Sequence, residues 1–136
     1  MPTIIRFEDI EAWKTARDLT RLIYGLTEQS AFAKDFGLKS QIQRACVSVM
    51  SNIAEGFGSR TPAQFIEYLG RAKASSGEVR CQLYIAADLI YMSEDQFRQA
   101  FDLAGKASRQ LARFIDYLES HPESRQVRDE RAEYAI

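Results

Sequence analysis

The sequence predicts an all-α protein, an antiparallel up-down-up-down four-helix bundle. Apolar residues recur at spacings of three and four in four separate segments, and two of these segments begin with a capping-box sequence. The connections between the segments are short, roughly 2 to 9 residues, which places neighbouring helices antiparallel. The main alternative, a helical solenoid, is disfavoured because no repeat at a fixed period is visible.

The first two helices are predicted from their apolar stripes. Asp9 is a plausible N-cap for a helix that runs to about Glu28. Residues 29–37 break the pattern, and a second helix then follows and stops at 56–58, Gly-Phe-Gly. The two stripes are Trp13, Ala16, Leu19, Ile23 and Leu26, and then Leu38, Ile42, Ala45, Val49 and Ile53.

The third and fourth helices have strong start signals. Thr61 caps the third, with Pro62 at its first position and Gln64 completing a capping box. Ser93 and Gln96 repeat this pattern for the fourth. We expect the third helix to reach about Met92, with the stripe Phe65, Leu69, Ala72, Ser76, Val79, Leu83, Ala86 and Ile90. The fourth carries Phe97, Ala100, Ala104, Ala107, Leu111, Phe114 and Leu118.

Length and composition indicate one globular domain. The chain has 136 residues, of which 46% are hydrophobic and 27% charged, enough for a single core without metals or disulfides. We expect the bundle to occupy residues 7–120. Residues 121–136 are rich in Arg and Glu and are interpreted as a flexible tail.

The charge balance limits the partners of the chain. The chain has eighteen Lys and Arg residues and nineteen Asp and Glu residues, so it has no overall positive charge. Any binding to nucleic acid or to an anionic membrane must therefore use a local basic patch. No signal peptide is visible, and no apolar run approaches the roughly 20 residues that cross a bilayer. We therefore expect a cytoplasmic protein with no membrane partner.

The two cysteines, Cys46 and Cys81, are interpreted as small core residues. If the second and third helices form a hairpin, Cys46 faces Lys73. Cys81 then lies about 12 Å further along, too far for a disulfide within the monomer.

The same hairpin places polar residues where a core is expected. Gln41 lies opposite Glu78, and Arg44 lies opposite Ser75, so that Arg44 can clamp the carboxylate of Glu78. Asn52 and Glu55 lie further toward the turn. We interpret the six residues as a network that fixes helix register. The alternative is a ligand or active-site pocket.

The second half of the third helix is apolar nearly all round, although a bundle buries only one stripe of each helix. Tyr84, Leu89 and Tyr91 are therefore expected to meet another surface. Self-association explains this pattern, and burial against loops is the alternative.

Catalytic and metal-binding patterns are not visible in the sequence. The single histidine, His121, lies beyond the fourth helix, so the paired Glu-x-x-His motifs of a di-iron bundle are missing. The chain has no CxxC, no HExxH and no glycine-rich phosphate loop. No nucleophile or base stands beside Glu55 or Glu78. We expect no enzyme activity, no metal and no cofactor.

A set of motifs resembles a known family. The chain looks like the bacterial four-helix-bundle proteins known from intervening sequences in large-subunit ribosomal RNA genes, over about residues 7–118. The resemblance is carried by Phe7-Glu8-Asp9-Ile10 with Trp13 and Ala16, by Leu38 and Gln41-Ile42-Gln43-Arg44-Ala45, by Ser48 and Asn52-Ile53-Ala54-Glu55-Gly56, and by Ser76 with Glu78.

The resemblance implies a protomer that assembles into a homopentameric ring. Related proteins are accessory factors of diversity-generating retroelements, which bind nucleic acid and a reverse transcriptase through a strongly basic surface. Three functions are hypotheses, of which an enzyme or small-molecule binder built on the level of Arg44 and Glu78 is the least favoured. Two others remain. One is a homo-oligomeric scaffold that presents surfaces to a protein partner. The other is a nucleic-acid-binding module that uses a local stripe formed by Arg60, Arg71, Lys73 and Arg80.

Overall fold

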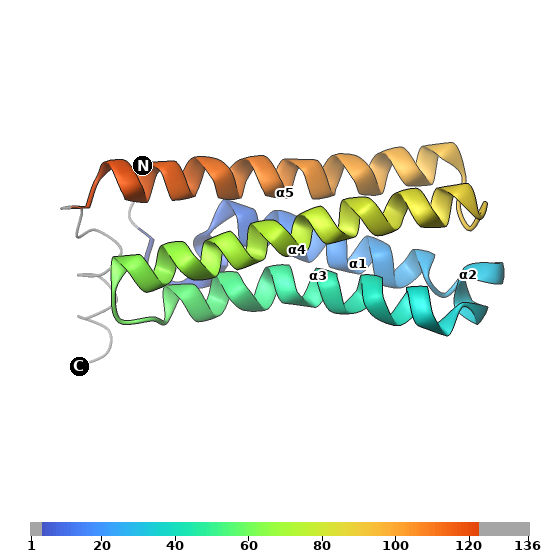
Figure 1. Cartoon of the computed structure of the whole chain (residues 1–136), viewed down its shortest axis with the longest axis horizontal. Coiled ribbons are helices and arrows are strands. Elements are labelled where there is room, and N and C mark those ends of the chain that lie inside the picture. Colours follow the sequence, from blue (N-terminus) through green and yellow to red (C-terminus); the bar gives the residue numbers. More distant parts are fainter. Residues whose placement is uncertain (1–3, 123–136) are drawn as a thin grey trace.

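The computed structural model describes residues 4–122 and confirms the predicted architecture. Within these residues the elements are the 3-10 helix η1 (Phe7–Asp9) and the α-helices α1 (Glu11–Leu26), α2 (Ser30–Lys34), α3 (Phe36–Phe57), α4 (Pro62–Asp88) and α5 (Glu94–Ser120). The four long helices α1, α3, α4 and α5 lie side by side and alternate in direction (Figure 1). None of the helices in this range is long and apolar enough to cross a membrane.

The long helices form a closed four-sided bundle. α3 packs against α1 and α4, while α5 packs against α4 and α1, so α1 and α4 are diagonal to each other. Each neighbouring pair is antiparallel, because every connection between long helices returns the chain along the bundle axis.

Both predicted capping boxes are present. The Thr61 hydroxyl accepts a hydrogen bond from the backbone N–H of Gln64, and the Gln64 side chain accepts one from the backbone N–H of Thr61. Ser93 and Gln96 do the same at the start of α5. Two donors that a helix start leaves unpaired are satisfied in each case.

The start of α1 differs from the prediction. Asp9 belongs to η1, and the N-cap position of α1 is taken by Ile10, which has no side chain that can cap. Ile10 is instead buried, with 2% of its surface exposed. Burial of this apolar side chain therefore fixes where α1 begins, and the prediction of an Asp9 cap was wrong.

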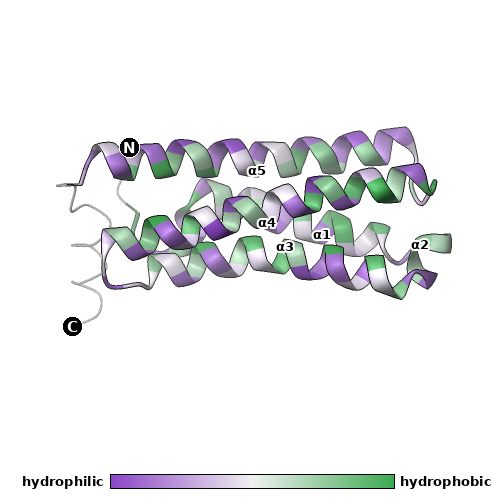
Figure 2. Cartoon of the chain, in the orientation of Figure 1, coloured by the Kyte–Doolittle hydropathy of each residue, from purple (hydrophilic) through white to green (hydrophobic). Residues whose placement is uncertain are grey.

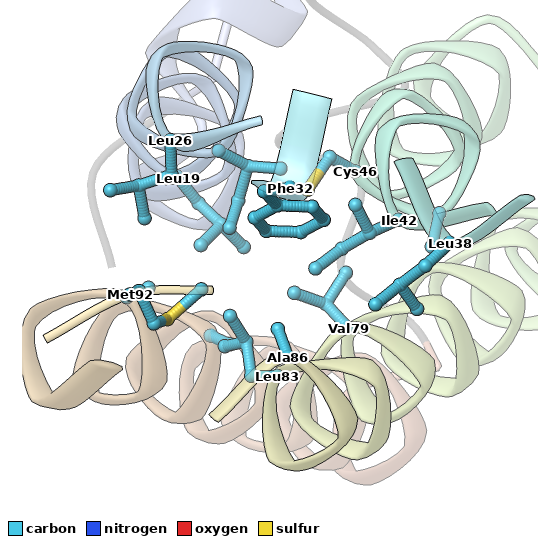
Figure 3. Close-up of a cluster of buried hydrophobic side chains, with 14 residues drawn as sticks. Leu19, Leu26, Phe32, Leu38, Ile42, Cys46, Val79, Leu83, Ala86 and Met92 are labelled. Atoms are coloured by element: carbon cyan, nitrogen blue, oxygen red, sulfur yellow. The ribbon is translucent and has the colours of Figure 1, made fainter. Parts of the chain in front are cut away.

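The segment between the first two predicted helices contains a short helix that the sequence did not reveal. α2 places the fully buried Phe32 across the end of the bundle, among residues of α1, α3 and α4 (Figure 3). Asp35 follows directly and caps α3, since its Oδ1 accepts from the N–H of Leu38 at 3.1 Å. Its Oδ2 accepts from the hydroxyl of Tyr91 at 2.9 Å, which joins α2 and α3 to the residues after α4.

The core consists of two apolar clusters, one in each half of the bundle. The predicted stripes of α3 and α5 are buried, apart from Phe97 and Leu118, which are partly exposed and pack against the clusters. Trp13 of α1 is also partly exposed. Ile90 is the exception in α4. The helix ends at Asp88 instead of Met92, and Ile90 is 84% exposed, so its assignment to the stripe was wrong.

The two cysteines are both free but differ in their surroundings. Cys46 is fully buried in the core, as predicted. Cys81 is exposed, which corrects the prediction that it is a core residue. Val79 and Leu83, two residues before and after Cys81, belong to the buried stripe of α4. Cys81 therefore lies on the opposite, outward face of the helix.

The predicted tail, 121–136, lies outside the described residues from 123 onward. His121, at the C-cap of α5, stacks on Tyr117 with 4.4 Å between ring centroids, and its Nδ1 lies 2.8 Å from the Tyr117 carbonyl oxygen.

Candidate functional site

A layer of short polar side chains separates the two apolar clusters. Ser48 of α3 and Ser75 of α4 share a hydrogen bond with 2.8 Å between their Oγ atoms, and Asn52 donates to Ser48 Oγ at 2.9 Å. Ser76 of α4 and Ser108 of α5 are also hydrogen-bonded. Because Ser76 gives its proton to the carbonyl of Lys73, Ser108 is the donor to Ser76. The layer joins α3 to α4 and α4 to α5.

Only two of the six residues predicted for a polar network take part in this layer. Ser75 pairs with Ser48, which lies one helical turn along α3 from its expected partner, Arg44. Side chains lean toward the N-terminus of their own helix. In an antiparallel pair, a side chain of α4 therefore meets a residue that lies later in α3 than the one directly opposite its Cα. Asn52 belongs to the layer through Ser48. Glu55 is exposed and makes no ion pair within residues 4–122.

The remaining three predicted network residues do not satisfy one another. Gln41, Arg44 and Glu78 are all exposed, and the part of the chain that the structure describes has no ion pair between Arg44 and Glu78. The expected clamp was therefore wrong, although the predicted hairpin did place the three residues at one level of α3 and α4. Together with Ala45, Ser48 and Gln82 they line an open groove of about 250 Å³.

Gln82 is the residue of this groove that the sequence analysis missed. Its side chain is buried, with 8% of the residue exposed, and its Oε1 has no hydrogen-bond partner. The sequence does indicate that Gln82 lies beside Glu78, because it follows Glu78 by one helical turn. Gln82 is also a polar residue at the start of an apolar run. Hydrogen-bonding groups that are buried in proteins are rarely left unpaired, so Gln82 marks the floor of the groove as unusual.

The residues predicted for an oligomer interface divide into two kinds. Tyr84 and Leu89 are 55% and 51% exposed, and Ile85 and Ile90 beside them are exposed as well. Figure 2 shows the hydrophobic residues gathered over this second half of α4. Tyr91 differs, because its ring stacks on Phe32 at 5.1 Å and its hydroxyl binds Asp35. It is half-buried by these contacts within the protomer, so it offers less surface to an outer interface than Tyr84 and Leu89 do.

Ile90 has a backbone conformation that is rare for its side chain. It is left-handed, with φ of 57°, at the end of α4. The N–H of Ile90 donates to the Ala87 carbonyl at 3.0 Å, and the N–H of Tyr91 donates to the Ala86 carbonyl at 2.9 Å. This pair of bonds is the Schellman motif, in which glycine usually occupies the position that Ile90 holds.

The four cations of the predicted nucleic-acid stripe do not form one surface. Arg71 pairs with Glu67 at 2.6 Å and lies 5.0 Å from the centre of the Tyr68 ring, on the side of α4 that contacts Gly56 of α3. Arg80 lies 5.1 Å from the centre of the Phe101 ring of α5. Lys73 is seven residues before Arg80 and shares its face. Arg60 lies in the connection between α3 and α4.

Arg80 adjoins a cluster of aromatic rings on the α4–α5 side of the bundle. Tyr84 lies 5.5 Å from Phe97 and 5.2 Å from Phe101, and these two phenylalanine rings stack at 5.1 Å. A cation over an aromatic surface is a combination that can hold a nucleobase or another flat ligand. Among residues 4–122, no group of three or more His, Cys, Asp or Glu side chains is placed to hold a metal ion.

Comparison with known proteins gives a family and a fold. The family model described as 23S rRNA-intervening sequence protein matches residues 8–113. The structure is similar to that of a protein of unknown function from the S23 ribosomal protein family of Bacteroides thetaiotaomicron, with a TM-score of 0.71 and 20% sequence identity over 77% of this chain and 95% of that one. At this identity the likeness concerns the fold. No curated protein matches the chain.

Proposed function

The chain belongs to the 23S rRNA-intervening sequence protein family, and from this premise we propose that it is a non-enzymatic scaffold that assembles with copies of itself. The exposed apolar surface at the end of α4 carries this proposal. Tyr84, Ile85, Leu89 and Ile90 remain exposed there, and surfaces of this kind usually mark contacts between proteins. The cytoplasm is the proposed compartment, where an exposed thiol such as that of Cys81 stays reduced.

The conformation of Ile90 supports a contact outside the protomer. A side chain in the left-handed region costs about 1–2 kcal/mol relative to glycine, and a β-branched side chain is especially disfavoured there. The left-handed conformation of Ile90 destabilises the protomer, and because its side chain is largely exposed, little burial within the protomer offsets this cost. A neighbouring copy that buries Ile90 would recover the cost.

A ring of five copies is the assembly that the family resemblance implies. A ring requires that one surface of a protomer bind a different surface of the next, which a patch on one end of one helix permits. The test is light scattering at micromolar concentration. We expect a mass of about five times the 15.5 kDa of one chain. A mass of a single chain under these conditions would contradict the proposal.

Variants of the apolar surface locate the contact. Leu89→Ser removes an exposed aliphatic side chain from the end of α4, and we expect it to weaken self-association at least tenfold, as measured by sedimentation. Val47→Ser, which changes an aliphatic side chain of comparable exposure on α3, is the matched control and should leave association unchanged. Equal effects of the two variants would place the contact elsewhere.

Ile90→Gly separates association from folding. Glycine relieves the left-handed strain, so the diluted protomer should melt higher by about 3–5 °C, whereas self-association should weaken. Loss of melting temperature in this variant would mean that Ile90 supports its own protomer. Unchanged association would remove Ile90 from the interface.

Binding of nucleic acid is a second candidate, favoured by the position of Arg80 over the Phe101 ring of α5. Lys73 lies on the same face, and repetition around an oligomer would multiply a modest affinity. The family resemblance motivates this candidate, since related proteins serve as accessory factors of diversity-generating retroelements, but the 18 Lys and Arg against 19 Asp and Glu of this chain depart from their strongly basic surface.

Fluorescence anisotropy with single-stranded RNA and with duplex DNA tests this second candidate. Affinity that falls between 50 and 200 mM salt, as phosphate contacts require, and that is reduced in Arg80→Gln, would support it. Arg71→Gln is the control, because Arg71 is already paired with Glu67 on the other side of α4. Absence of binding at the lower salt concentration would end the candidate.

A further inference from the structure

The groove between α3 and α4 contains one cation and one anion that are both free. Arg44 and Glu78 line the groove, and neither forms an ion pair or hydrogen bond within residues 4–122. They also lie more than the ion-pair distance of 4 Å from each other, although they face the same space. A bridging group that carries both charges therefore has room between them.

Gln82 adds a hydrogen-bonding group that the protomer leaves without a partner. The residue is more than nine-tenths buried and lines the groove, and its Oε1 accepts no hydrogen bond. An unpaired buried acceptor is unfavourable, and a donor brought to it recovers the loss. The last torsion of a Gln side chain is broad and roughly two-fold, so a half-turn about it exchanges the two polar atoms of the amide and brings the enclosed Oε1 toward the groove.

The floor of the groove is held in place by the polar layer. Ser48 Oγ is fixed by Asn52 at 2.9 Å and by Ser75 at 2.8 Å, and the short side chain of Ala45 leaves space beside it. Groups held by such supporting bonds keep their geometry when a ligand arrives. The hydroxyl of Ser48 is thus held in a fixed position between α3 and α4.

The charges of the lining select the kind of ligand. A simple anion at Arg44 meets the nearby carboxylate of Glu78, and a simple cation at Glu78 meets the guanidinium of Arg44. A small molecule with a carboxylate and an ammonium group satisfies both, because guanidinium binds carboxylate in a paired geometry and the ammonium can donate to Glu78 and Gln82.

A second recess provides space for a side chain of the ligand. Arg44 and Ser48 also line a hollow of about 410 Å³ on the other side of α3, toward α1. Its walls include Tyr24 and Val47, which are 41% and 42% exposed. An aliphatic group that extends past Arg44 would cover these two side chains, and burying apolar surface there adds affinity.

We propose that the α3–α4 groove binds a zwitterionic amino acid with an aliphatic side chain, its carboxylate on Arg44 and its ammonium group on Glu78 and Gln82. This binding site is independent of the self-association proposed above. Its residues lie in the middle of the bundle, whereas the apolar contact surface lies at the end of α4.

Calorimetric titration of the full chain with L-leucine, N-acetyl-L-leucine and L-leucinamide tests the proposal. These three probes share a side chain but carry both charges, only the negative charge or only the positive charge. We expect saturable binding of L-leucine at least tenfold tighter than that of the other two. No saturable binding, or equal binding of the three probes, would overturn the proposal.

Variants then assign the two charges. Arg44→Gln and Glu78→Gln should each weaken L-leucine binding at least tenfold with an unchanged melting temperature, whereas the exchange Arg44→Glu with Glu78→Arg should retain binding within a few-fold. Arg21→Gln, on the exposed face of α1, is the control. Light scattering of the same variants gives a separate readout. A fall in oligomer mass in either single variant would show that a second copy covers the groove, and would overturn the binding site.

Discussion

At the scale of single residues, burial gives the two cysteines opposite properties. Cys46 is enclosed in the core, and this burial raises the pKa of its thiol to about 12. Cys81 faces solvent from α4. Because the thiolate is the reactive form, only one of the two thiols is available at neutral pH.

Thiol titration at pH 8 checks this difference. We expect an aromatic disulfide reagent to react quickly with one thiol per native chain and with the second only on unfolding. In Cys81→Ser the fast reaction should disappear. Two fast thiols in the native protein would mean that the core around Cys46 opens readily.

Tyr91 links folding to pH. The hydrogen bond that its hydroxyl donates to Asp35 favours the protonated phenol and raises the pKa of Tyr91 above its ordinary value of 10.0. The unfolded chain therefore loses this proton at lower pH than the folded chain. The stabilisation is fully present below about pH 10 and is lost as the pH rises further.

Melting temperatures of the protein and of Tyr91→Phe, measured from pH 8 to pH 11, test this link. At pH 8 the variant should melt lower, because the bond to Asp35 is absent. Above pH 10 the difference should narrow. A difference that stays constant over the whole range would show that the bond does not control the titration of Tyr91.

Glu78 shows how exposure changes an energetic expectation. A buried pair with Arg44 would make Glu78→Ala destabilising by about 3 kcal/mol. Since Glu78 is exposed and unpaired within the described chain, we expect a change of less than about 0.5 kcal/mol in urea unfolding. A larger loss would mean that Glu78 has a partner in the assembled protein.

At the scale of elements, Gly56 sets how closely two helices approach. A Cβ at Gly56 in α3 would lie 2.7 Å from Tyr68 Cβ and 2.9 Å from Phe65 Cδ1 of α4, which is too close. Gly70 in α4 is helical too, but a Cβ there would meet nothing within 4 Å. Gly56 lies in the last turn of α3 against α4, whereas Gly70 lies inside α4 and faces open space.

This contrast gives a matched pair of variants. Gly56→Ala should reduce the free energy of unfolding by about 1–3 kcal/mol, because α3 and α4 must separate. Gly70→Ala should raise it by about 0.5–1 kcal/mol, because alanine favours the helix. Stabilisation by both substitutions in urea melts would show that the α3–α4 contact yields without cost.

The elements also differ in how visible they are in sequence. α4 and α5 were predicted with their starts because Thr61 and Ser93 form capping boxes within three residues of chain. α2 was not predicted, because five residues are too few to show a recurring helical pattern of apolar residues. Its position depends on Phe32, which packs among α1, α3 and α4, and α4 follows only after the whole of α3 in the chain.

At the scale of the whole molecule, the polar layer separates two apolar halves. A polar pair in an otherwise apolar core specifies helix register, because a shifted alignment would bury a hydroxyl without its partner. The bond between Ser76 and Ser108 therefore favours one alignment of α4 with α5.

A double-mutant cycle measures the coupling of this pair. Ser76→Ala leaves the hydroxyl of Ser108 without its acceptor and should cost about 1–2 kcal/mol. Addition of Ser108→Ala removes the unpaired group, so the double variant should lose less than the two single losses added together. Strict additivity in urea unfolding would show that the two serines act independently.

The sequence by itself determined the four long helices, most of their buried stripes and the capping boxes that start α4 and α5, because these features depend on residues three or four positions apart. It also brought Gln41, Arg44 and Glu78 to the α3–α4 side of the bundle. Only the tertiary structure decided which polar groups meet. A shift of one turn between α3 and α4 leaves the apolar stripes facing the core. With this shift Ser75 forms its hydrogen bond with Ser48 instead of Arg44, and Arg44 and Glu78 line a groove without forming an ion pair.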